Sequence, residues 1–170
     1  MRYLVLLFIA LLTFTGCVSA SQTVDESVAS EIPEGANVIN LYSDMEPAKY
    51  YDTIYSQLAR EGYEIAASDD ERLTLSTGPR DVGQETTLAL RLFVEEAAAS
   101  EARSRAMLRG RWGVSGTFAA GMSAGFGAGI DQNVGEPAEW KQSNRAGVAF
   151  GAMAQFVSEL PHQSVEYVTE

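Results

Sequence analysis

Residues 86–95 read TTLALRLFVE, a stretch in which a large aliphatic side chain occupies every second position from Leu88 to Val94. Side chains of a β-strand point alternately to the two faces of a sheet, so these aliphatic residues share one face. The other face carries the remaining side chains, namely Thr87, Ala89, Arg91, Phe93 and Glu95. The stretch therefore predicts a long strand with one face packed against a core.

A second long strand is predicted over residues 104–114, SRAMLRGRWGV. Its inner side chains are Ala106, Leu108, Trp112 and Val114. We expect residues 97–102 to form the loop between the two strands, although their composition alone suits a helix. Before residue 86, the segments 63–67 and 72–77 predict a hairpin around a turn at 68–71, and Gly78-Pro79 breaks the chain. The segments 37–42 and 164–169 predict the first and last strands.

Two helices are predicted. Ser43-x-x-Glu46 matches a capping box and Pro47 suits a first turn, so the first helix should begin here and run to Glu61. Gly62 is placed to take the positive φ that ends a helix. The apolar stripe of this helix is Tyr51, Ile54, Tyr55 and Leu58. The second helix should run over 144–160 and end before Pro161.

The element order is therefore β-α-β-β-β-β-α-β. It predicts an α+β fold of two layers, a single antiparallel sheet with both helices packed on one face. We expect this globular domain to span residues 36–170. Residues 115–139 are rich in Gly and Ala, and we interpret them as an irregular insertion in the domain.

The composition excludes several functions. The formal net charge is −11, which argues against a nucleic-acid partner, because phosphate binding depends on Lys and Arg. One Cys and one His cannot form an internal disulfide or a usual zinc site. We expect no cofactor and no metal. The acidic turn at Asp69-Asp70-Glu71 lacks the ligand spacing of a calcium loop, so we interpret it as a solvated turn.

The N-terminus has the pattern of an export signal. Arg2 precedes an apolar run from Tyr3 to Phe14, shorter than the about twenty residues that span a bilayer. The following Phe14-Thr15-Gly16-Cys17 resembles the lipobox of bacterial lipoproteins, with Phe14 where that family usually carries Leu. The resemblance implies that residues 1–16 are removed as a signal peptide. It also implies that Cys17 receives a thioether-linked diacylglycerol and an acyl group on its new amino terminus.

This anchor defines the expected location. Val18 follows the cysteine in place of Asp, which by the sorting rules of that family favours the outer membrane. Residues 17–35 are small, polar and acidic, so we interpret them as the lipidated cysteine and a flexible tether. The domain would then lie in the periplasm, with exposure at the cell surface left open.

The predicted domain also looks like the helix-plus-sheet modules of envelope assembly lipoproteins, such as the accessory lipoproteins of the outer-membrane β-barrel machinery. This is a likeness of fold. It implies a non-enzymatic binding or assembly module, held to the lipid bilayer through acylated Cys17, with an envelope protein or polymer as partner.

Arginines cluster on the predicted outer face of the two long strands. The candidate interaction residues are Arg91, Arg103, Arg105, Arg109 and Arg111. Guanidinium groups in a row can bind carboxylates or phosphates in a bidentate manner. The alternative is cross-strand pairing with acids of the same chain, such as Glu95 and Glu96.

Two other functions remain open within the Gly/Ala-rich region. The segment 121–125 (Gly-Met-Ser-Ala-Gly) resembles the nucleophile elbow of α/β-hydrolases, which implies a serine hydrolase using Ser123, Asp131 and His162. Its glycine-rich flanks do not suit the strand and helix that an elbow requires. Alternatively, Gly121, Gly125 and Gly129 form a glycine zipper within the uncharged segment 112–130, which would associate in a membrane. We favour a mobile surface loop over both.

Overall fold

The computed structural model describes residues 29–98, 101–114, 135–141 and 144–170. In these residues the chain forms an antiparallel sheet of eight strands and two helices, α3 and α5. The predicted α+β class with a single antiparallel sheet is confirmed. The predicted element order was incomplete, because two short strands were not predicted.

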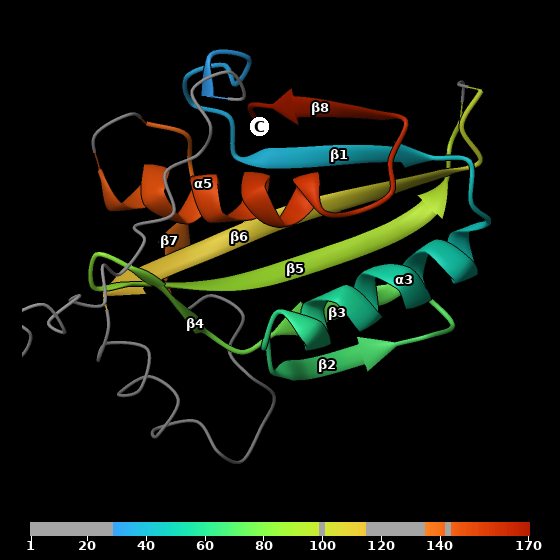
Figure 1. Cartoon of the computed structure of the whole chain (residues 1–170), viewed down its shortest axis with the longest axis horizontal. Helices are drawn as coiled ribbons and strands as arrows, with labels where there is room; N and C mark the ends of the chain where they lie inside the picture. Colours follow the sequence, from blue (N-terminus) through green and yellow to red (C-terminus); the bar gives the residue numbers. More distant parts are fainter. Residues whose placement is uncertain (1–28, 99–100, 115–134, 142–143) are drawn as a thin grey trace, which may run out of the picture.

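The sheet has the strand order β2–β3–β5–β6–β1–β8, with β4 paired to β5 and β7 paired to β6 (Figure 1). The strands are β1 (Val38–Ser43), β2 (Ile65–Asp69), β3 (Thr74–Thr77), β4 (Arg80–Gly83), β5 (Thr86–Glu96), β6 (Ser104–Val114), β7 (Glu136–Pro137) and β8 (Ser164–Val168). The long strands β5 and β6 are paired along their whole length and form the centre of the sheet. The N-terminal strand β1 lies between β6 and β8.

The core lies between the sheet and the helices α3 (Pro47–Arg60) and α5 (Arg145–Ser158). Figure 1 shows both helices in front of the same face of the sheet. The alternating aliphatic residues of β5 point to this face and are buried there with Leu108 of β6 and Ile39 of β1. The opposite, outer face of the sheet carries no helix among the described residues.

Helix α3 ends as predicted and begins differently. Gly62 has φ +78°, and the Tyr63 N–H donates to the Leu58 carbonyl at 2.9 Å, which closes a Schellman motif. At the start, the capping box at Ser43 is wrong. Ser43 belongs to β1, its Oγ accepts from the Met45 N–H at 3.3 Å, and the N-cap residue is Glu46, with Pro47 as the first helical residue.

Helix α5 comes unusually close to its surroundings at two glycines. Asn144 caps the helix by accepting a hydrogen bond from the Gly147 N–H at 2.9 Å. A Cβ on Gly147 would overlap the backbone carbonyl of Lys141. On the sheet side, Gly110 of β6 leaves space for Met153 of α5, where any Cβ would meet the Met153 sulfur.

The limits of the domain and of its predicted insertion differ from the expectation. Part of the insertion predicted over 115–139 is ordered structure: Glu136–Pro137 form β7, and Ala138 is fully buried, with its N–H donating to the Gly110 carbonyl at 2.9 Å. The rest of that insertion, 115–134, lies outside the described residues. The last residues of the expected tether also pack on the domain, because Ile32 is buried in the core.

Helix α3 contains an unusual buried hydroxyl, that of Tyr50. The Tyr50 side chain is fully buried, and no described group hydrogen-bonds its hydroxyl. We expect Tyr50→Phe to raise the free energy of unfolding at neutral pH by about 1 kcal/mol, because an unpaired buried hydroxyl costs about that much. Chemical denaturation measures this, with the exposed Tyr55→Phe as a control expected to change little.

The same substitution should have a pH signature. Burial raises the pKa of Tyr50 above its ordinary value of 10.0. The unfolded state therefore loses the proton first, and the wild-type protein loses stability as the pH rises above about 10. The advantage of Tyr50→Phe should grow over that range. A variant that is less stable than wild type at neutral pH would show that the hydroxyl has a partner.

Candidate functional site

The outer face of the central strands is organised in cross-strand rows. The register of β5 and β6 places Ala89 opposite Arg111 and Arg91 opposite Arg109. The next rows are Phe93 opposite Met107 and Glu95 opposite Arg105. These side chains share the face away from the helices, because their neighbours in sequence are the buried residues of the core.

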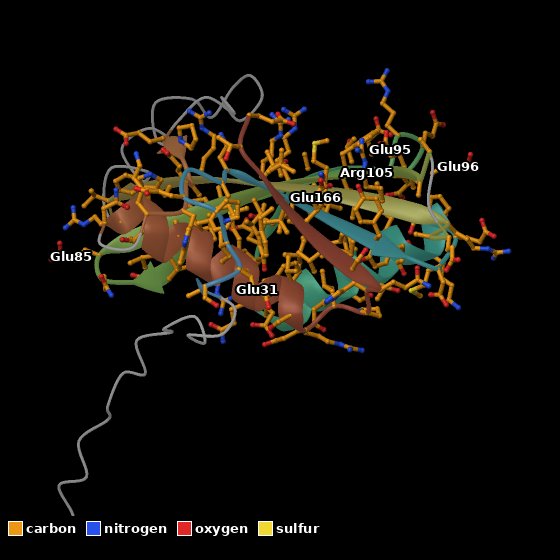
Figure 2. The ribbon with its side chains drawn as sticks, turned by 90° about the horizontal axis from the view of Figure 1, so that it is seen from above. Glu31, Glu85, Glu95, Glu96, Arg105 and Glu166 are labelled. Carbon is orange, nitrogen blue, oxygen red and sulfur yellow. The ribbon has the colours of Figure 1, made fainter. Side chains whose placement is uncertain are left out.

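One end of this face is neutralised by its own charges. Arg105 forms an ion pair with Glu95, and on the neighbouring strands the Tyr42 hydroxyl donates to Glu166 at 3.1 Å. Asn40 also donates to Glu166, at 3.4 Å. Figure 2 shows Glu95 and Arg105 together on the side of the sheet away from the helices. Partial burial acts to lower the pKa of Arg105, but Glu95 and Tyr42 outweigh it, and the pKa is raised.

The other end of the face is cationic. Arg91 is exposed, and no hydrogen bond or ion pair joins its side chain to another described residue. It lies directly opposite Arg109, a pairing of like charges that disfavours folding. Arg109 forms an ion pair with Glu170. We call Arg91, Phe93, Met107 and Arg109 the cationic patch.

Exposed apolar atoms lie beside these charges. Phe93 keeps 37% of its surface exposed, and the only comparable large apolar side chain among the described residues is Tyr55 of α3, at 38%. Met107 opposite Phe93 is half-buried. The cationic patch thus combines guanidinium groups with apolar surface, which is the composition of many protein-binding surfaces.

The five arginines that the sequence analysis assigned to one interaction face have different surroundings in the structure. Arg103 precedes β6 and pairs with Glu46 at the start of α3, with 2.6 Å between Nη1 and Oε1. Arg111 hydrogen-bonds the Gly135 carbonyl, and Arg105 is neutralised by Glu95. Only Arg91 and Arg109 face each other in one row of the sheet.

Sequence reasoning missed a cleft beside the end of β6, near the start of α5. Trp112 of β6, Trp140 and the first turn of α5 line an open cavity of about 590 Å³, with Gln84 and Arg145 at its rim. The Trp112 Nε1 has no hydrogen-bond partner in the described part of the chain. Arg145 pairs with Glu85 at 2.8 Å. Both tryptophans of the chain line this cavity, but they are 28 positions apart in the sequence and only the fold brings them together.

Other sequence-predicted residues are placed only in part. Cys17, Ser123 and Asp131 lie outside the described residues, as does most of the segment 112–130. His162 is exposed in the loop before β8, and its Nδ1 lies 2.8 Å from the Leu160 carbonyl. A carbonyl oxygen only accepts, so that nitrogen carries the proton. Nothing in the described structure joins His162 to a nucleophile.

The acidic turn at residues 69–71 is held by its own side chain. Asp69 Oδ1 accepts hydrogen bonds from the backbone N–H groups of Glu71 and Arg72, at 3.1 and 3.0 Å. Over the described ranges, no cluster of three or more His, Cys, Asp or Glu side chains is arranged to hold a metal ion.

Comparison with known proteins assigns neither a family nor a function to the chain. No protein-family model matches the chain, and no curated protein sequence matches it. Among the helices of the described residues, none is long and apolar enough to cross a bilayer.

Proposed function

We propose that this protein is a non-enzymatic envelope lipoprotein, anchored to a bilayer through Cys17, whose domain binds a partner through the outer face of its sheet. The observation that carries the binding function is the cationic patch. It places Arg91 directly opposite Arg109 in the sheet, next to the row of exposed Phe93, on a face that no described helix covers. The anchor rests on the lipobox-like segment 14–17.

The anchor has a direct test. Cells expressing the protein are fed a clickable fatty acid, and the purified product is analysed by intact mass. We expect the label on wild type and its loss in Cys17→Ser, because the sulfur is the acceptor of the diacylglycerol. The intact mass should correspond to loss of residues 1–16 and addition of the lipid. An unmodified thiol in the native product would contradict the proposal.

The binding face is tested by site-specific photo-crosslinking. The photoreactive residue p-benzoylphenylalanine replaces Phe93, and in a matched variant it replaces Tyr55 on the opposite layer of the domain. The two positions are almost equally exposed, at 37% and 38%, so they differ in location and little in access. We expect a specific crosslinked product from position 93 in intact envelopes, and none of that product from position 55. The same crosslinks from both positions would contradict a role for the outer face.

A further inference from the structure

We infer that the cationic patch binds an extended acidic polypeptide segment, and that Glu170 of the same chain occupies part of this site as an internal competitor. The inference rests on the proposed function, which names the outer face as the binding surface. It adds the chemical class of the ligand and a contact that limits its access.

The charges of the cationic patch favour binding of an anion. Arg91 and Arg109 are Cα partners across β5 and β6, so the pairing of these strands keeps the two arginines neighbours on one face of the sheet. Arg91 has no ionic partner among the described residues. In a chain of net charge −11, two cations held together in one row form a local positive surface complementary to acidic groups.

Glu170 shows how the patch receives a carboxylate carried by a polypeptide. Its side chain forms the ion pair with Arg109. Its backbone is held by Asn37, whose Nδ2 donates to the Glu170 carbonyl at 2.9 Å and whose Oδ1 accepts from the Glu170 N–H at 3.0 Å. One amide side chain thus binds both backbone groups of the residue that supplies the acid. This contact shows that a carboxylate carried by a polypeptide can reach Arg109, and the adjoining Phe93 and Met107 suit an apolar side chain of a peptide, which a phosphate polymer lacks.

The spacing between the row of Arg91 and the row of Phe93 indicates which two ligand positions would contact the patch. Arg91 and Phe93 are two residues apart on β5, which in an extended chain is a separation of roughly 6.8 Å. Alternate residues of an extended peptide have the same separation. A segment lying along β5 can therefore place an Asp or Glu at the arginines and an aromatic or aliphatic side chain two positions away, against Phe93 and Met107.

Another carboxylate can replace that of Glu170 on Arg109. The Arg109 and Glu170 side chains keep 50% and 45% of their surface exposed, and an ion pair this exposed is weak. An incoming carboxylate can replace that of Glu170 on Arg109 while Arg91 binds it from the other side. The site is therefore occupied weakly by the protein's own acid and more strongly by a ligand that reaches both arginines.

The test uses the full lipoprotein in neutral detergent micelles and a short fluorescein-labelled peptide with Glu and Phe at alternate positions. Binding is measured by fluorescence anisotropy in low-salt buffer. We expect Arg91→Gln to weaken binding about three- to fivefold, as loss of one exposed ion pair should. The control Arg72→Gln removes the same charge from a site 82% exposed on the β2–β3 turn and should bind like wild type. We expect Glu170→Gln to strengthen binding about two- to threefold, because the competitor is lost.

Three results would overturn the inference. Equal weakening by Arg91→Gln and Arg72→Gln would show a general charge effect. Binding unchanged by Glu170→Gln would show that its carboxylate does not compete. Binding of inorganic polyphosphate in place of the peptide would assign the patch to another class of anion. Each can occur while the fatty-acid label and the position-93 crosslink are still obtained, so failure here is distinct from failure of the proposed function.

Discussion

Gly147→Ala is expected to lower the free energy of unfolding by about 3 kcal/mol or more, because overpacking against a fixed group costs at least about 1–3 kcal/mol. The added Cβ would overlap the carbonyl oxygen of Lys141, which is backbone and cannot rotate away as a side chain can. Any shift of α5 would also stretch the hydrogen bond from Gly147 to the capping Asn144. Denaturant unfolding followed by circular dichroism measures the loss.

A second glycine separates this clash from the general effect of replacing glycine. Gly62 has φ +78°, and a Cβ there would meet nothing within 4 Å. Gly62→Ala should therefore cost only the strain of a positive φ, about 1–2 kcal/mol. If Gly147→Ala lost no more stability than Gly62→Ala, the close approach of the Lys141 carbonyl to α5 would be wrong.

The second large effect is expected at Gly110, the point where β6 contacts α5. Gly110→Val should cost about 3 kcal/mol, because its side chain would enter space held by Met153 and approach Leu88 Cδ1, which lies 2.8 Å from the Cβ position. Met153→Ala alone should cost about 2–4 kcal/mol through the cavity that it leaves. The two residues share one space, so their effects should not add.

A double-mutant cycle checks this coupling. The variant that combines Gly110→Val with Met153→Ala should be less destabilised than the sum of the single variants by about 1–3 kcal/mol. The pair Gly110→Val and Tyr55→Ala serves as the additive control, because Tyr55 is exposed on α3 and Gly110 is buried beneath α5. Strict additivity at both pairs would mean that Met153 does not occupy the space over Gly110.

The long elements were predictable from the sequence because their patterns repeat several times. The alternation along β5 and β6 fixed their extent closely, and the stripe of α3 with Gly62 fixed where that helix ends. The two missed strands carry little pattern. β4 has four residues with a register irregularity, and β7 has two residues, one of them a proline. Such short strands form because a long neighbouring strand has backbone N–H and C=O groups free to pair with them. The short segment itself carries no sequence pattern that indicates this pairing.

The sequence predicted which face of the sheet carries the candidate site, but it did not predict which residues of that face lie together. Alternation placed Arg91 and Arg109 on the outer side, but which arginine lies opposite which depends on the register between strands. The contact of Asn37 with Glu170 joins residues 133 positions apart, so only the folded sheet brings them together. The cleft between the tryptophans likewise depends on how α5 sits against the end of β6.

The position of β1 between β6 and β8 has a consequence for the order in which the sheet can form. Its Val38 pairs with Arg109 on one side and Val168 on the other, so among the described strands the first along the chain is completed by the last. Such distant pairing slows folding. A chain that emerges amino-terminus first therefore cannot complete the sheet around β1 until residues 164–168 have emerged. Loss of residues 164–168 would leave β1 as a bare edge, open to association with other chains.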